Sequence, residues 1–447
     1  MESMDLTKGS VKRVLLAFAV PFFIANALQA AYGAVDLYTV GRFCGTSAVS
    51  AVNIGSQAMQ IVTSFVIGIA MGTTVMIARA SGEKNQEMIQ KILQSSVWIL
   101  IVLAAVLTVA MMLGESAIVS WMMTPAEAVA ETRTYIRLCC YGILFIVIFN
   151  INAAIMRGRG DSRTPMILVG ISGLINVVGY LALTGFFQMG VADVAAATAA
   201  SQMVSALLSI YVLHQRKASA GRFPFPINAT CMRSIFSIGL PIAMQDTLIN
   251  ISFMILTLVA NQRGLASSSA VGIVEKLITF MFLVPSSMLS SVSAFTAQNL
   301  GAQKKDRIHS CVLFAMGLTA GFGALMCLLS WLMPQQMAAI FAKDPEVIVY
   351  AGEYLRSYSI DCILVGFTFV INGYLSGMGR SIIAFIHNTI AIFLVRIPAA
   401  FLLSAAYPAS MFPMGFASPL GSCFSIAFLV IYFSYKKNTG RRQAEVQ

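Results

Sequence analysis

Charge is scarce in this sequence. Of its 447 residues, 11% are charged and 58% are hydrophobic, and the mean hydropathy is +0.81. Soluble domains carry about a quarter charged residues, so the composition excludes a soluble domain of ordinary type. It indicates a polytopic membrane protein instead, and the lipid bilayer is its first expected partner.

Clusters of metal-binding or catalytic side chains are also lacking. The three histidines, His214, His309 and His387, are scattered along the chain, and the eight cysteines form no C-x-x-C pair. Metal sites and catalytic triads need such groups close together. We therefore expect no enzyme activity, no metal-binding cluster and no cofactor.

Long apolar segments dominate what is present, and each is long enough to cross a bilayer as a helix, which takes about 20 residues. There are twelve: Val14–Val40, Ala48–Ile77, Ile92–Leu113, Ile136–Ile155, Met166–Phe187, Val191–Leu213, Ile235–Ala260, Ala270–Ala297, Cys311–Leu332, Tyr354–Ser376, Ile382–Tyr407 and Met411–Phe433. The first is too long for a signal-peptide core, so we expect it to be retained.

The net charge of +11 could indicate nucleic-acid binding, but the positions of the basic residues favour another explanation. Most of the 29 lysines and arginines fall in segments on one side of the predicted membrane. Such a bias places that side in the cytoplasm. The sequence therefore predicts cytoplasmic N- and C-termini, no nucleic-acid partner and, from the short tails, a bacterial inner (plasma) membrane protein.

The second half of the chain repeats the first at a shift of 219 to 220 residues. Pro21 then matches Pro241, Gly82 matches Gly301 and Asn152 matches Asn372. Six spans per copy predict an all-α fold of twelve transmembrane helices in two pseudo-symmetric six-helix lobes. The predicted division is 1–213 (N-lobe), 214–234 (cytoplasmic linker), 235–434 (C-lobe) and 435–447 (basic tail).

One carboxylate interrupts the first span. Asn26, Gln29, Gly33 and Asp36 follow at steps of three, four and three, which places them on one helical face. An acid facing lipid is costly, so this face should look into protein or a watery cavity. Asp36 is the first candidate for ion coupling, and a charge that reaches the membrane interface is the alternative.

The second span carries a similar one-sided stripe. Asn53, Gln57, Gln60 and Ser64 recur at steps of four, three and four, and we expect them to face Asp36 across a substrate cavity. Helix-to-helix hydrogen bonding is the alternative for each amide. Asn152 and Asn176 are candidate hydrogen-bond partners of Asp36.

The second half differs from the first at the positions where we expect ion coupling or substrate binding. Leu256 stands at the position that matches Asp36, whereas Asp246, Glu275 and Asp361 are acids of the second half alone and are candidates for substrate binding. The cations Lys276 and Arg396 also lie within spans. The sequence does not decide which carboxylate either cation meets, and a purely structural pair is equally open.

Several of these motifs resemble one known family. The D-x-x-x-V-G-R-x-x-G-x-x-A-V run from Asp36, the MRGRGDSRTPM and QNLGAQ loops, and the two L-x-x-P-like span starts look like the multidrug and toxic compound extrusion (MATE) family. GLPIAMQD and VRIP, which contains Arg396, resemble its DinF-like branch. The resemblance covers nearly the whole chain.

That resemblance implies export of cationic, amphipathic drugs by alternating access of two lobes, coupled to H+ or Na+. It implies that Asp36 is the coupling carboxylate, which could also bind Na+, and that Asn176 belongs to the polar network around Asp36. Tyr180 departs from the family pattern, in which an Asp follows the Asn by four residues. A two-carboxylate proton site is therefore in doubt, and the ion stays open.

Two other functions of membrane proteins are considered, export of another substrate and channel activity. A flippase or exporter of a lipid-linked or other endogenous metabolite could share two six-span lobes, although only Lys276 and Arg396 are available in the spans to bind phosphate. A channel would need a ring of identical groups, which two unequal lobes do not provide. We expect the protein to act as a monomer.

Overall fold

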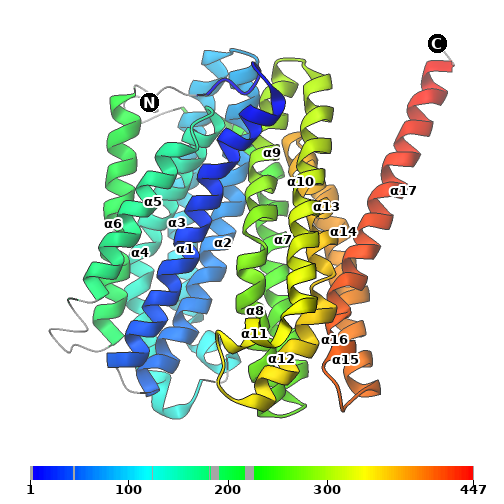
Figure 1. Cartoon of the computed structure of the whole chain (residues 1–447). Coiled ribbons are helices and arrows are strands. Elements are labelled where there is room, and N and C mark those ends of the chain that lie inside the picture. The colour runs from blue at the N-terminus through cyan, green and yellow to red at the C-terminus, as the bar shows by residue number, and fades with distance from the viewer. Residues whose placement is uncertain are drawn as a thin grey trace. The chain divides into compact units, whose positions relative to one another are not determined.

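The computed structural model describes residues 4–43, 46–122, 124–180, 182, 191–216 and 226–445. Within these ranges, the side chains of residues 33–43, 46, 49, 180, 193 and 438–445 are not described. All regular structure in the described ranges is helical, and this confirms the predicted all-α class. Figure 1 shows the helices.

The helices of the first half are α1 (Val11–Phe43), α2 (Thr46–Gly82), α3 (Gln86–Trp121), η1 (Ala126–Ala128), α4 (Val129–Gly158), α5 (Arg163–Tyr180) and α6 (Val191–Gln215). Those of the second half are α7 (Ala229–Asn261), α8 (Leu265–Met281), α9 (Leu283–Gly301), α10 (Lys305–Leu332), α11 (Pro334–Ala339), α12 (Pro345–Tyr358), α13 (Asp361–Gly377), α14 (Ser381–Ile390), the π-helical stretch η3 (Ala391–Arg396), α15 (Ile397–Ala406), α16 (Phe412–Gly415) and α17 (Ala417–Glu445).

The predicted spans coincide with these helices. Nine helices of the described ranges are long and apolar enough to cross a bilayer, and two bent pairs, α8–α9 (43°) and α12–α13 (48°), raise the number to 11. The shorter apolar helix Arg163–Gly179 lies in the fifth predicted span. Each of the twelve predicted segments therefore overlaps a helix, and the chain is a multi-pass membrane protein.

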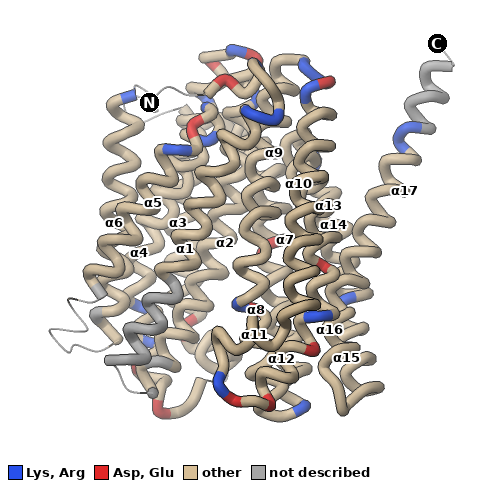
Figure 2. The backbone as a smooth tube through the Cα atoms, viewed as in Figure 1, with Lys and Arg blue, Asp and Glu red and all other residues tan. Residues whose placement is uncertain are grey.

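The chain divides into two compact units. Unit 1 comprises Met1–Ala243 with Ala294–Ile308, and unit 2 comprises Met244–Ser293 with His309–Gln447. Within unit 1, α4 packs against α2, α3 and α6, and α1 packs against α5. Figure 2 shows the charged residues of unit 1 near the ends of its helices, with uncharged stretches between them. The predicted lobe boundaries stay a prediction.

The internal repeat is visible in the backbone. The α2–α3 turn and the α9–α10 turn each contain a non-glycine residue of positive φ, Lys84 (54°) and Gln303 (57°), at the expected shift. Each turn also closes with the same hydrogen bond, from Asn85 N to Ala80 O (3.0 Å) and from Lys304 N to Asn299 O (2.8 Å). The two halves therefore share local structure as well as sequence.

Candidate functional site

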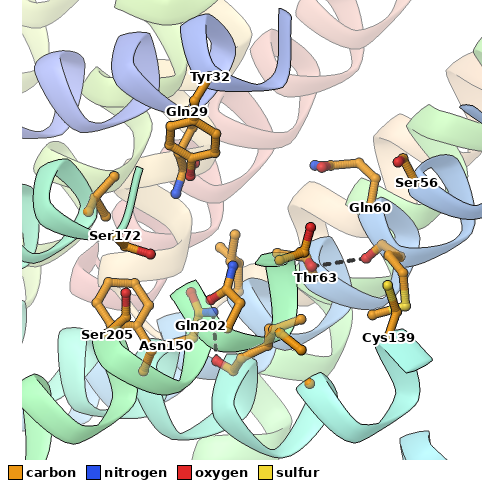
Figure 3. Close-up of a pocket in the computed structure, with 18 of the residues that line it drawn as sticks. Gln29, Tyr32, Ser56, Gln60, Thr63, Cys139, Asn150, Ser172, Gln202 and Ser205 are labelled. Carbon is orange, nitrogen blue, oxygen red and sulfur yellow. Dashed lines mark hydrogen bonds between the residues drawn. The ribbon is translucent and has the colours of Figure 1, made fainter. Parts of the chain in front are cut away.

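A cavity of about 330 Å³ opens among the helices of unit 1. This volume lies at the small end of the range for small-molecule sites, roughly 300–1,000 Å³. Its polar lining comes from five helices: Gln29 and Tyr32 of α1; Asn53, Ser56, Gln60 and Thr63 of α2; Tyr135, Cys139 and Asn150 of α4; Ser172 of α5; Thr198, Gln202 and Ser205 of α6. Figure 3 shows this cavity.

The stripe predicted in the second span contributes to this wall. Asn53 and Gln60 line the cavity, together with Ser56 and Thr63 of the same helix. The hydroxyl of Thr63 donates to the carbonyl oxygen of Met59, one turn earlier (2.9 Å). Gln57 is an exposed residue but is not part of the lining. Of the predicted stripe, Asn53 and Gln60 therefore line the cavity whereas Gln57 and Ser64 do not, and its role in substrate binding stays a prediction.

Of the polar residues predicted in the first span, Gln29 lines the cavity and Asn26 does not. Gln29 points from α1 into the cavity, toward Gln202 of α6 (Figure 3). Beside it, Tyr32 packs so closely on α5 that a Cβ added at Gly173 would lie 2.6 Å from the tyrosine ring. Asn26 is half-buried outside the lining.

Helix α6 supplies a polar stripe that the sequence reasoning missed. Thr198, Gln202 and Ser205 line the cavity, and Ser209 follows one turn later, bonded to Asn152. Their steps of four, three and four repeat the spacing of the stripe in α2. The same periodicity test applied to the sixth span would have found them.

Aromatic rings form much of the remaining wall. Tyr135 and Phe149 of α4 line the cavity, and so does Tyr32 of α1. The hydroxyls of Tyr135 and Ser56 are 3.1 Å apart and hydrogen-bonded. Ring faces attract organic cations by cation–π interaction, so this wall suits a flat or cationic ligand.

The two predicted partners of Asp36 lie outside the lining. The amide nitrogen of Asn152 donates to Ser209 Oγ (2.9 Å). Asn176 is 5% exposed; its Nδ2 donates to Ser201 Oγ (3.5 Å), and its Oδ1 has no hydrogen-bond partner among the described atoms. Asn176 therefore keeps an acceptor available. Asp36 and Tyr180 themselves have side chains outside the described part of the structure.

The acids of the second half lie in unit 2. Glu275 accepts a hydrogen bond from Thr257 (3.0 Å), and Asp361 is 4% exposed. Arg396 stacks over the ring of Phe253 at 4.4 Å, and its Nε and Nη2 atoms have no hydrogen-bond partner in the described ranges. No carboxylate of those ranges lies within ion-pair distance of Arg396. Asp246 is half-buried in α7, and Lys276 is exposed.

The described lining of the cavity carries no charge, because it consists of amides, hydroxyls, aromatic rings, one thiol, one thioether and aliphatic groups. The residues that the structure describes also contain no group of three or more His, Cys, Asp or Glu that could hold a metal ion. The lining can hydrogen-bond a ligand and stack on it. It offers no nucleophile with an adjacent base.

Comparisons with known proteins agree with this architecture. The sequence profile of the MatE family matches residues 21–181 and 241–402. The probable multidrug resistance protein YoeA of Bacillus subtilis is 26% identical over 96% of this chain and 94% of its own length. A FAD transporter of Shewanella oneidensis is 23% identical over 88% of both chains.

Solved structures show the same fold. A crystal structure of MATE in complex with MaL6 superposes with a TM-score of 0.90 at 19% sequence identity, over 98% of this chain and all of the other. At that identity the likeness establishes the fold alone. The two profile matches each start at one of the paired prolines, Pro21 and Pro241, and so follow the internal repeat.

Proposed function

The chain belongs to the MatE (MATE) family of multidrug efflux transporters, and on that premise we propose that it exports cationic, amphipathic drugs in exchange for H+ or Na+. Relatives named as multidrug resistance proteins support the substrate class. The observation that carries the proposal is the cavity of unit 1, where three aromatic rings face a lining of neutral amides and hydroxyls.

Drug binding in this cavity needs no fixed counter-charge in the lining. A planar cation can stack on Tyr32, Tyr135 or Phe149 while Gln29, Gln60 or Gln202 accepts or donates hydrogen bonds. Amide side chains supply both donors and acceptors, so one site accommodates ligands of differing polarity.

Ion coupling is assigned to Asp36. It lies in α1, seven residues after the cavity residue Gln29, and therefore two turns further along the same helical face. Protonation or Na+ binding at this acid would favour one orientation of the transporter over the other, and the drug would favour the opposite one. The downhill ion then drives the drug outward, from a plasma-membrane protein with both termini in the cytoplasm.

Purified protein in liposomes tests this proposal. Ethidium or a fluoroquinolone serves as the drug, and pH and Na+ gradients are imposed separately. We expect drug flux driven by one of the two gradients. Drug flux that follows neither gradient would contradict the coupling.

A second candidate function is export of an endogenous metabolite. One relative is named a FAD transporter, and an uncharged lining does not select for cations in the way that an acidic one would. Competition decides between the two: FAD should displace ethidium only if the cavity is built for such metabolites. Ethidium binding that FAD leaves unchanged favours the drug exporter.

A further inference from the structure

The residues before α1 bind a specific partner elsewhere in the chain. Leu6 donates its backbone N–H to Gln298 Oε1 (2.9 Å), and its carbonyl oxygen accepts a hydrogen bond from Asn299 Nδ2 (3.1 Å). The Leu6 side chain is fully buried. Both amide residues lie at the end of α9 and belong to unit 1, as Leu6 does. We call residues 4–9 the N-terminal segment.

Two basic residues bind the rest of this segment through its carbonyl oxygens. Lys304 Nζ donates to Thr7 O (2.8 Å). Arg307 donates to Gly9 O (2.7 Å), Lys8 O (3.1 Å) and Leu6 O (3.2 Å), and its Nε donates to Asn299 Oδ1 (3.1 Å). Hydrogen bonds from charged donors are about twice as strong as neutral ones.

The start of the segment is hydrogen-bonded to a turn in the first half of the chain. Met4 N donates to Gly160 O in the α4–α5 turn (3.1 Å). A Cβ added at Gly160, whose φ is 87°, would lie 2.1 Å from Met4 O. The N-terminal segment thus joins the α4–α5 turn of the first repeat to the α9–α10 turn of the second.

The amide residues that bind Leu6 are not repeated in the first half of the chain. At the shift of 219 residues, Gln298 and Asn299 correspond to Arg79 and Ala80. Arg79 makes an exposed ion pair with Glu83 instead (3.1 Å), and Ala80 has no amide. The amide pair that binds Leu6 is therefore particular to the second copy.

Beneath the segment, the two repeats touch backbone to backbone. A Cβ added at Gly82 would lie 2.0 Å from Gln298 O, and one added at Gly301 would lie 2.1 Å from Arg79 O. Beside this contact is a cavity of about 290 Å³, lined by Met4, Asp5 and Thr7 of the segment and by Ser81 and Lys84 of the α2–α3 turn. The hydrogen-bonded segment therefore also borders a cavity that it shares with the α2–α3 turn.

We propose that the N-terminal segment is a latch that joins the α4–α5 turn to the α9–α10 turn and thereby keeps the contact between the α2–α3 and α9–α10 turns closed, and that it must detach each time this end of the transporter opens. The proposal rests on the alternating access of the proposed function. The distribution of basic residues predicts that this end faces the cytoplasm, so the latch stabilises the outward-facing state.

Hydrogen–deuterium exchange of the full chain in lipid nanodiscs tests the latch without any transport assay. Leu6→Ala and Asn299→Ala should each speed amide exchange in residues 79–85 and 298–304 about tenfold or more, as expected when a buried leucine is truncated and a local opening becomes easier. Thr7→Ala is the matched control, because the Thr7 hydroxyl donates to Asp5 within the segment (2.7 Å).

The outcomes separate the latch from the proposed function. Faster exchange that is confined to the two turns supports the latch even if the wild type shows no ion-driven drug flux, a result that would overturn only the transport proposal. Exchange in the two turns equal to that of Thr7→Ala overturns the latch. So does an increase that is equally large throughout α4, because it would mean global destabilisation.

Discussion

Leu6 and Gln298 are 292 positions apart in the sequence, yet the backbone N–H of one donates to the side-chain Oε1 of the other over 2.9 Å. Gln298 is 5% exposed and Leu6 is fully buried. A short stretch before the first helix is thereby fixed to the end of a helix in the second repeat. The interaction joins the first repeat to the second at the place that the proposed alternating access would have to open.

Gly82 and Gly301 should tolerate no side chain. Gly301→Ala places a Cβ about 2 Å from the Arg79 carbonyl oxygen, and such an overpacked contact typically costs 1–3 kcal/mol. We expect the closed α2–α3/α9–α10 contact to open in this variant, with faster deuterium exchange in both turns. Gly317→Ala is the control, because a Cβ added at Gly317 in α10 would meet no described atom within 4 Å apart from its chain neighbours and the backbone of its own helix. Equal exchange in the two variants would contradict the close contact.

The wall of the cavity depends on another glycine. A Cβ added at Gly55 would lie 2.2 Å from Cδ1 of Tyr135, so Gly55→Ala should displace the Tyr135 ring and break its hydrogen bond to Ser56. We expect weaker binding of aromatic cations and a loss of about 1–3 kcal/mol in stability. Ethidium fluorescence titration and thermal denaturation measure the two effects. Unchanged ethidium affinity would exclude Tyr135 from the binding wall.

Gln202 of α6 should contribute directly to binding. A hydrogen bond is worth about 0.5–1.5 kcal/mol net, so Gln202→Ala should weaken drug binding roughly 3- to 10-fold. The same change at the exposed Gln336, outside the cavity lining, should leave affinity unchanged. Isothermal titration with a hydrogen-bonding fluoroquinolone measures both variants. Matching affinities would remove Gln202 from the site.

Asp161 should make stability depend on pH. Burial alone would raise the pKa of this carboxyl, but hydrogen bonds from Thr164 and Arg216 outweigh it and hold the pKa below 3.8. The resulting stabilisation is present above about pH 3.8 and is lost as the pH falls through the lower, folded-state value. Asp161→Asn should lower stability by about 2 kcal/mol at pH 7, since hydrogen bonds to charged groups are worth roughly 1.5–3 kcal/mol.

Thermal denaturation between about pH 2 and pH 7 checks this prediction. The difference in Tm between wild type and Asp161→Asn should be constant above about pH 4 and should shrink as the pH falls below that value. Gln336→Asn, at an exposed position of α11 without an ionisable group, provides the control, and its difference in Tm from the wild type should be the same at every pH. A constant difference in Tm across the range would contradict the role of the ionised carboxylate.

The helices were predictable because a bilayer admits few alternatives to long apolar helices, and the repeat followed from shared Pro, Gly and Asn positions. The face of α2 was predictable from the spacing of Asn53 and Gln60. The stripe of α6 was harder to recognise, because Ser and Thr also bond to their own helix, as Thr198 does to Val194 O (3.1 Å). The pairing of Leu6 with Gln298 leaves no periodic signal, since it joins an irregular segment to one helix end.

Asp36 is proposed to couple an ion to the drug site in unit 1. The most direct test of this coupling is drug exchange by Asp36→Asn in proteoliposomes, driven by whichever gradient drives the wild type. Ion-driven exchange should be abolished while drug still binds, because Asn keeps the size of the side chain but cannot change its charge. Undiminished exchange by Asp36→Asn, with Glu346→Gln as the reference, would contradict the coupling.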